Sequence, residues 1–248
     1  MSKLWQPWQL LGEGKPNGVL IVGDHGSNAV PPWIDLGLTL DVMQEHVYWD
    51  IGVAGVAQIM TSSGSYAAFL GAQSRLVVDL NRDPDDQAVI PEHSDGHMII
   101  GNRLDDTGRI DRLADFHHPY HAALTQQISA MHPSLILSLH SFTPALRNSG
   151  EQRPWQIGVL YNEQAAASEL AIGFLEGQGM RVGDQLPYSG KMLNATMNRH
   201  AEARSIPYIG IEMRQDLVSE LSGQARFAQI LDDMCQHVAE RLALPRGN

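Results

Sequence analysis

Side chains that can bind a metal or move a proton follow several apolar runs of the sequence. Asp24 and His25 follow "GVLIVG", and His140 closes "LILSLH". Glu212 lies inside a further apolar run, "YIGIEM". Imidazole nitrogens and carboxylate oxygens are ligands for divalent metals, and a catalytic zinc site uses three protein ligands and keeps one position for water. These residues therefore predict a metal-dependent hydrolase.

Residue types alone leave the third ligand open. We expect His25 and His140 to be the nitrogen ligands, and the third is Asp24, Asn28 or Asp50. Asp50 stands in "HVYWDIGVAGVA" at the start of a predicted helix, where an aspartate often caps the first free amides instead. A lone histidine behind a strand is more often a hydrogen-bonded loop residue. Two such histidines, together with the aspartate and a late glutamate, favour a metal site.

Two arginines bracket the apolar stretch "LVVDLN". Arg75 and Arg82 suit the recognition of an anion, because each guanidinium offers a fork of donors to a carboxylate. The alternative is that Arg82 merely pairs with the aspartates that follow it. Asn81 adds a neutral donor, and its even spacing from Arg75 predicts that both lie on one face of a strand. The long segment from Asp83 to Gly101 is a candidate lid over the substrate.

The remaining histidines are weaker candidates. His117 and His121 in "HHPYHAAL" have the i,i+4 spacing of a metal pair, but Pro119 lies between them. We expect a helix to begin at the proline and to leave His117 outside it. His93 and His97 flank a predicted turn, and we expect both to be exposed loop residues.

A sheet must position these side chains. Short β-rich runs alternate with stretches in which apolar residues recur every three or four residues. The predicted strands are Gly18–Gly23, Arg75–Leu80, Leu135–Leu139, Ile157–Asn162 and Tyr208–Met213. The predicted helices are Ile51–Ser62, Ile110–Met131, Ala165–Gln178, Met192–Arg204 and Leu217–Leu242. Strands that are apolar on both faces need helices on both sides, so the pattern predicts a three-layer α/β/α fold with its ligand site at the carboxyl edge of the sheet.

Composition narrows the class of protein. A chain of 248 residues with 43% hydrophobic residues can bury the core of a single domain over residues 1–248. A net charge of −11 argues against nonspecific binding to nucleic acid or to an anionic membrane. The N-terminus lacks a signal-peptide pattern and no apolar run is long enough to span a membrane, so we expect a cytoplasmic protein. Oligomeric state is left open.

Three other chemistries have little support in the sequence. The single cysteine, Cys235, allows neither an intrachain disulfide nor a thiolate zinc cluster. No G-x-S-x-G elbow occurs, which argues against a serine amidase. The glycine spacing of phosphate-binding loops is missing as well, which argues against phosphoester chemistry of that type.

Seven sequence blocks, taken in order, resemble the N-formylglutamate amidohydrolase family. They are "DHGSNAVP", "DIGVAGVA", "SRLVVDLNRDP", "HHPYHAAL", "LHSFTP", "GVLYN" and "IEMRQDLV", and they span about Val19 to Val218. The resemblance implies a zinc carboxypeptidase-like (phosphorylase/hydrolase-like) fold with a central mixed, largely parallel sheet. It also implies a zinc-dependent enzyme whose substrate is a small anionic N-acyl amino acid such as N-formylglutamate, cleaved to formate and the amino acid.

The resemblance also implies roles for individual residues. The metal ligands would be His25, Asp50 and His140, and the catalytic carboxylate would be Glu212. The substrate contacts would be Arg75, Asn81 and Arg82, with His121 and Arg214 as further candidates. The chain departs from carboxypeptidases at Asn28, where they place a ligand glutamate, and this is why Asp50 is expected as the third ligand. The alternatives are an aspartoacylase-like deacylase of a larger acyl group and a noncatalytic protein that binds acidic metabolites.

Overall fold

A seven-stranded sheet forms the middle layer of the computed structural model, which describes residues 5–39, 48–146 and 150–243. The strands are β1 (Trp8–Leu11), β2 (Val19–Gly23), β3 (Tyr66–Gly71), β6 (Leu135–Phe142), β7 (Ile157–Leu160), β8 (Val182–Asp184) and β9 (Tyr208–Arg214). Their order across the sheet is β1-β3-β2-β6-β9-β7-β8. β3, β2, β6 and β9 run parallel, whereas β1 and β7 pair antiparallel with β3 and β9. The predicted mixed, largely parallel sheet is confirmed.

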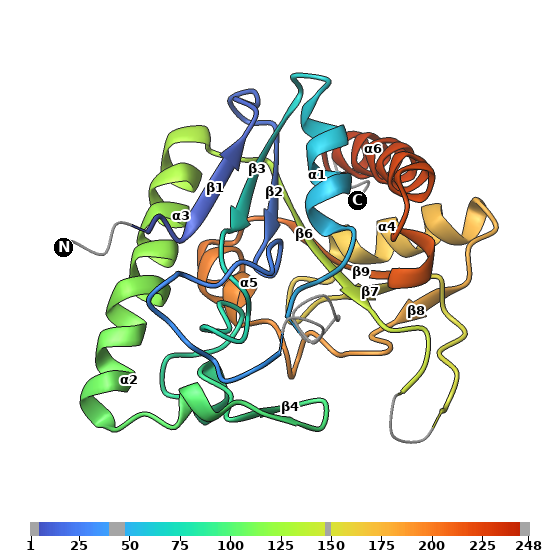
Figure 1. The fold of residues 1–248 in the computed structure, drawn as a ribbon. Helices are drawn as coiled ribbons and strands as arrows, with labels where there is room; N and C mark the ends of the chain where they lie inside the picture. The colour runs from blue at the N-terminus through green and yellow to red at the C-terminus, as the bar shows by residue number, and fades with distance from the viewer. Residues whose placement is uncertain (1–4, 40–47, 147–149, 244–248) are drawn as a thin grey trace.

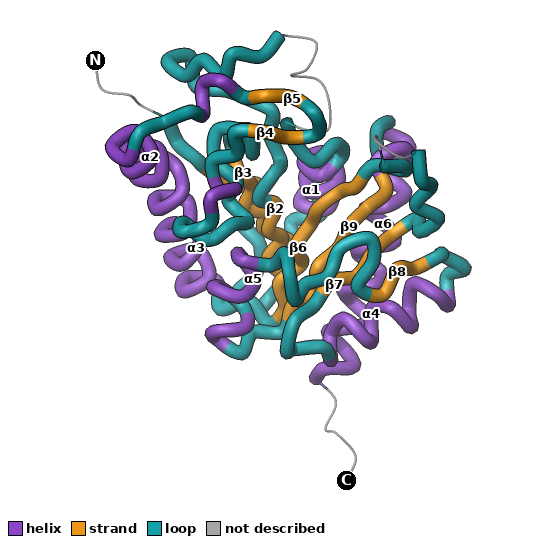
Figure 2. Tube along the Cα trace, turned by 90° about the horizontal axis from the view of Figure 1, so that it is seen from below, coloured by secondary structure: helices purple, strands orange, loops and turns teal. Residues whose placement is uncertain are grey.

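Helices cover both faces of this sheet (Figures 1 and 2). One face carries α1 (Val53–Thr61), α4 (Ala166–Gly177) and α6 (Leu221–Ala243); the other carries α2 (Asp106–Arg112), α3 (His118–Met131) and α5 (Ala195–His200). Successive strand residues point to opposite faces, so Leu135 and Leu137 join the first core and Ile136 joins the second. The three-layer prediction is therefore confirmed. Within the described ranges, no helix has the length and apolarity needed to cross a membrane.

The predicted strand Arg75–Leu80 is wrong. This segment forms turns, and β3 takes the place beside β2 in the sheet. Leu76, Val77, Val78 and Leu80 are nevertheless buried, because they pack into the core beneath α3. A short apolar run predicts burial more securely than it predicts strand pairing. The strand face that Arg75 and Asn81 were expected to share does not exist.

The helical segment before β6 begins earlier than predicted. A π-helical turn at Leu113–His117 joins α2 to α3, so helical structure runs without a break from Asp106 to Met131. Pro119 is the second residue of α3, and the wider preceding turn accommodates a residue that has no amide hydrogen to donate. The expectation that His117 lies outside the helix is therefore wrong.

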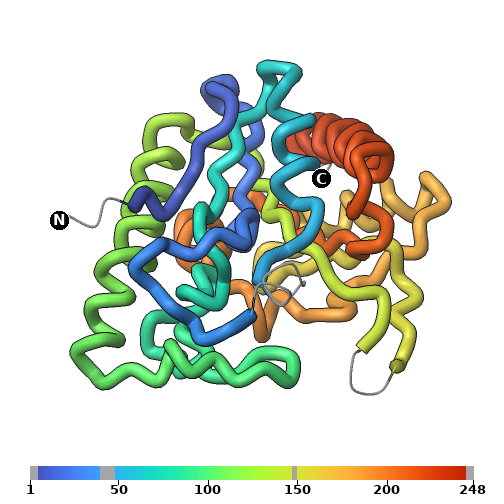
Figure 3. The backbone as a smooth tube through the Cα atoms, in the orientation of Figure 1, coloured from blue at the N-terminus to red at the C-terminus, as the bar shows by residue number. Residues whose placement is uncertain are grey.

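The segment from Asp83 to Gly101 lies beyond the carboxyl ends of β2 and β3, at the lower edge of Figure 3. It contains a 3-10 turn at Gln87–Val89 and a hairpin of β4 (His93–Ser94) and β5 (His97–Met98). The predicted turn between His93 and His97 is confirmed, since Asp95 and Gly96 both have positive φ, as a two-residue hairpin turn requires. His93 is exposed and His97 is half-buried.

Gly52 fixes how the chain passes from Asp50 into α1. Its φ is 88°, and a Cβ at this position would lie 2.5 Å from the carbonyl oxygen of Val218. We expect Gly52→Ala to lower the free energy of unfolding by about 1–3 kcal/mol, because it combines backbone strain with a backbone clash. Chemical denaturation measures the change. Gly173→Ala in α4, where a Cβ would meet nothing within 4 Å, is the control, and equal stability of the two variants would contradict the prediction.

Candidate metal centre

Three strands and one helix start bring the candidate residues together at the carboxyl edge of the sheet. His140 on β6 and Glu212 on β9 are register partners, so their side chains lie next to each other on one face. His25 follows the end of β2, and its carbonyl oxygen accepts a hydrogen bond from the amide of Asp50 at 2.9 Å. This is the edge at which open α/β sheets bind ligands.

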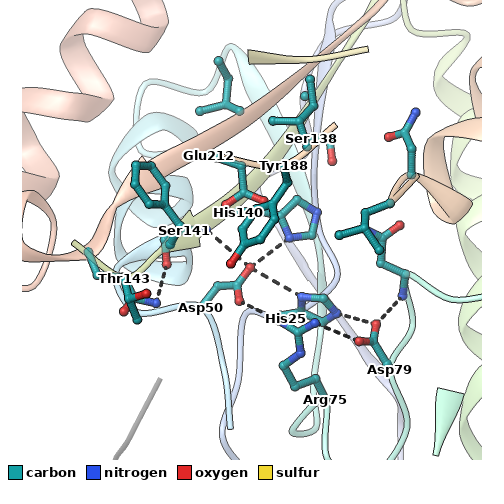
Figure 4. Close-up of a pocket in the computed structure, with 18 of the residues that line it drawn as sticks. His25, Asp50, Arg75, Asp79, Ser138, His140, Ser141, Thr143, Tyr188 and Glu212 are labelled. Atoms are coloured by element: carbon teal, nitrogen blue, oxygen red, sulfur yellow. Dashed lines mark hydrogen bonds and ion pairs between the residues drawn. The ribbon is translucent and has the colours of Figure 1, made fainter. Parts of the chain in front are cut away.

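The side chains of His25, Asp50 and His140 converge on one another (Figure 4). Asp50 Oδ2 lies 2.8 Å from His140 Nδ1 and 3.4 Å from His25 Nδ1. All three residues are buried, and His25 Nδ1 has no hydrogen-bond partner among the described residues. Two nitrogens and one carboxylate oxygen at such separations suit a single zinc ion with ligand bonds of about 2.0–2.2 Å. Asp50 does not cap α1, so its alternative role as a helix cap is wrong.

A carboxylate also lies at the far ring nitrogen of each histidine. His25 Nε2 is hydrogen-bonded to Asp79 Oδ1 at 2.8 Å. His140 Nε2 lies 3.7 Å from Asp24 Oδ2, and the hydroxyl of Tyr120 donates to Asp24 Oδ1 at 2.7 Å. Carboxylates in this position fix the tautomer and the ring orientation of metal-binding histidines.

The positions of Asp24 and Asp79 bear on the choice of ligands. Asp24 stands behind His140 and is not part of the convergent group, and Asn28 does not line the cavity. Sequence reasoning missed Asp79, although it lies two residues before Asn81 in the same block, "DLNRDP". Asp79 is bonded to His25 from the turn at residues 75–80, where the sequence predicted a strand.

The charges of the cluster favour a cation at its centre. Burial and Arg75 oppose protonation of His25, but the carboxylates of Asp79 and Asp50 outweigh them and raise its pKa to about 9. Burial likewise opposes ionisation of these two aspartates. His25 nevertheless holds the pKa of Asp50 well below its usual range, and Arg75 together with His25 does the same for Asp79. The site therefore stabilises positive charge, which a divalent ion would supply.

Glu212 differs from the other carboxylates of the site. Burial raises its pKa to about 7, and its Oε2 atom has no hydrogen-bond partner in the described part of the chain. A carboxyl group with a pKa near neutrality can both accept and return a proton, which is the property of a general acid–base residue. This environment fits the predicted role of Glu212.

Residues 17–219 match the sequence model of the N-formylglutamate amidohydrolase family. The chain belongs to this family. It is 26% identical to the gene product Atu2144 from Agrobacterium tumefaciens over 97% of each chain, with a TM-score of 0.89. It is 19% identical to the N-formylglutamate amidohydrolase from Ralstonia eutropha JMP134, over 95% of this chain and 97% of that one, with a TM-score of 0.74, which shows a shared fold. No curated protein matches by sequence.

In this member of the N-formylglutamate amidohydrolase family, a cavity of about 360 Å³ opens over the candidate centre. This volume lies within the usual range for small-molecule sites. Three predicted substrate contacts, Arg75, Asn81 and Arg82, line the cavity. Other polar lining residues were not predicted from the sequence: Asp79, Asp95, Ser138, Ser141, Thr143, Arg153, Tyr188, Asn194 and Gln215.

The structure does not place His121 at the cavity. Its ring is buried, with Nε2 bonded to the carbonyl oxygen of Leu80 at 3.0 Å and Nδ1 bonded to His200 Nε2 at 2.8 Å. His117 Nε2 similarly bonds the carbonyl oxygen of Arg82 at 3.0 Å. These histidines therefore support the backbone of the turn that carries Asn81 and Arg82. The direct substrate contact expected for His121 is not what the structure shows.

Arg214 does not line the cavity either. Its Nε and Nη2 atoms donate to the carboxylate of Asp216 at 2.8 and 3.2 Å. Its Nη1 atom donates to the carbonyl oxygens of Arg153 and Trp155 at 3.4 and 3.5 Å. Arg214 therefore holds a neighbouring segment of backbone, and the cavity residue of that segment is Arg153.

Proposed function

We propose that this protein is a zinc-dependent amidohydrolase that cleaves the N-formyl amide of a small acidic amino acid such as N-formylglutamate. Family membership supports amide hydrolysis. The observation that carries the proposal is the convergence of His25, Asp50 and His140 in one cavity with Glu212. Two imidazoles and a carboxylate suit zinc among the common divalent metals.

The residues of the cavity divide the chemistry between them. His25, Asp50 and His140 would hold the ion, and bound zinc would polarise the acyl carbonyl and lower the pKa of water at the site. Glu212 takes a proton from the attacking water and returns it to the leaving amine nitrogen, which yields formate and the free amino acid. Arg75, which donates to Asp50 Oδ1 at 3.4 Å, stands beside the site and can stabilise negative charge that develops on the acyl oxygen.

Asn81 and Arg82 are assigned to the α-carboxylate of the substrate. The side-chain oxygen of Asn81 accepts from the amide of Thr196 at 3.0 Å, and within the described chain its Nδ2 donates to no acceptor. Arg82 Nη1 donates to Asp86 Oδ2 at 3.0 Å, but both side chains are about one-third exposed. Such a pair contributes at most about 1 kcal/mol, so a substrate carboxylate can replace it.

Arg82→Met is therefore expected to raise the Michaelis constant about tenfold while zinc content and melting temperature stay unchanged. The increase should be similar for N-formyl-L-glutamate and N-formyl-L-glutamine, because both carry the α-carboxylate. Steady-state formate release measures it, and Arg226→Met on the exposed side of α6 is the control. Unchanged Michaelis constants would mean that Arg82 only pairs with Asp86.

Metal analysis of the purified protein, followed by a formate-release assay over N-formyl amino acids, tests the function as a whole. We expect about one zinc per chain and release of formate from the acidic substrates. One zinc per chain without hydrolysis of any N-acyl amino acid would contradict the proposal and favour a binding protein.

A further inference from the structure

The cations already assigned to the substrate are largely neutralised within the protein. Arg75 Nη2 lies 2.8 Å from Asp79 Oδ2, and its Nη1 lies 3.4 Å from Asp50 Oδ1. Arg82 pairs with Asp86 at 3.0 Å. In a protein of net charge −11, these arginines leave little positive charge for a substrate with two carboxylates.

Arg153 lines the same cavity, but its hydrogen-bond partners differ from those of Arg75 and Arg82. All of its hydrogen bonds within the described residues use Nη1, which donates to Thr143 Oγ1 at 3.0 Å, to the Thr143 carbonyl oxygen at 3.4 Å and to the Tyr188 hydroxyl at 3.3 Å. No carboxylate in residues 5–39, 48–146 or 150–243 pairs with it. Nε and Nη2 are left as two parallel donors, which is the edge that a carboxylate binds in a bidentate manner.

The guanidinium of Arg153 is held in place. Its central carbon lies 5.2 Å from the ring centre of Tyr188 and 5.9 Å from that of Phe142. Arg214 fixes the backbone beneath it through the carbonyl oxygens of Arg153 and Trp155. A donor pair that is oriented in advance loses less entropy when it binds an anion.

Neighbours of Arg153 and Arg82 lie on opposite sides of the candidate metal centre. Arg153 precedes β7, which is separated from β2 by β6 and β9 in the sheet. Its hydrogen-bond partner Thr143 and the neighbour of Arg82, Asp79, lie on opposite sides of His25 in Figure 4. A ligand that meets both cations therefore needs two anionic groups.

We propose that Arg153 binds the side-chain carboxylate of the substrate's amino acid, and so selects N-formylated dicarboxylic amino acids over their amides. This inference rests on the proposed function, in which Asn81 and Arg82 bind the α-carboxylate. Arg153 is half-buried at the cavity wall. A donor pair that suits a carboxylate is poorly satisfied by an amide of the same shape, and this mismatch gives the discrimination.

N-formyl-L-glutamate and N-formyl-L-glutamine test the proposal, because they have nearly the same shape and differ by one charge. We expect the parent protein to prefer the glutamate. Arg153→Met should lower kcat/KM for the glutamate by about 10- to 100-fold and change that for the glutamine by less than about threefold. Arg153→Lys, which keeps a charge but no fork, should retain part of the preference, and Arg226→Met should retain all of it.

A glutamate-to-glutamine preference that is the same in the parent and in Arg153→Met would overturn the proposal. The proposal would also be overturned if Arg153→Met lost activity only toward substrates with a carboxylate in the acyl group, such as N-succinyl amino acids. Calorimetry with the products L-glutamate and L-glutamine separates this inference from the proposed function. Selective binding of L-glutamate that Arg153→Met removes, without formate release by the parent, would support the Arg153 site and contradict the amidohydrolase.

Discussion

Glu212→Gln is expected to lower kcat by about two to four orders of magnitude while the protein keeps its metal. Glutamine has nearly the same shape as glutamate and keeps the strand packing, but its amide does not accept the proton of the attacking water. Glu212 is 7% exposed, stands beside His140 on the neighbouring strand, and has an oxygen without a partner among the described residues. Each of these features suits proton transfer in the cavity.

The measurement combines kcat for N-formyl-L-glutamate with the zinc content of the same preparation. Glu240→Gln, an exposed position on α6, is the matched control and should behave as the parent. Near-normal turnover in Glu212→Gln would remove this residue from the mechanism. Loss of zinc together with turnover would instead show that Glu212 contributes to metal binding.

Asp50→Asn is expected to reduce bound zinc from about one ion per chain to below about a tenth after dialysis against a chelator, and to abolish formate release. Asp50 Oδ2 lies 2.8 Å from His140 Nδ1 and 3.4 Å from His25 Nδ1, so the substitution removes the charge of the proposed carboxylate ligand. A neutral amide is a much weaker ligand for zinc than a carboxylate.

Asp233→Asn on the exposed side of α6 is the matched control for this experiment. Zinc retained by Asp50→Asn at the parental stoichiometry would mean that another residue is the third ligand. Asp24→Asn then becomes the informative variant, because Asp24 Oδ2 lies 3.7 Å from His140 Nε2.

The positions at which apolar runs end in the sequence predicted which histidines meet at the candidate centre. His25 and His140 follow or close runs that fold as β2 and β6, and parallel strands bring their carboxyl ends to one edge. The pairing of His140 with Glu212 is a property of strand register. Register depends on contacts between strands far apart in the chain, so sequence alone did not reveal it.

Other parts of the site depend on contacts that carry no local signal. The apolar residues between Arg75 and Leu80 are buried in the same core as α3. A buried turn and a buried strand can have the same composition, so the sequence does not distinguish them. The hydrogen bond from Tyr120 to Asp24 joins residues 96 positions apart. Arg153 stands out only when the other two arginines of the cavity, Arg75 and Arg82, are seen to pair with carboxylates, which requires coordinates.

The buried histidines beneath the turn that carries Asn81 and Arg82 have a consequence for the pH dependence of activity. Burial lowers the pKa of His121 to about 2 and that of His200 to about 3. Both rings therefore stay neutral at and around neutral pH, and the hydrogen bond from His121 to the carbonyl oxygen of Leu80 is kept there. The inflections of a pH–rate profile should accordingly report groups in the cavity, while the scaffold that holds Asn81 and Arg82 stays constant.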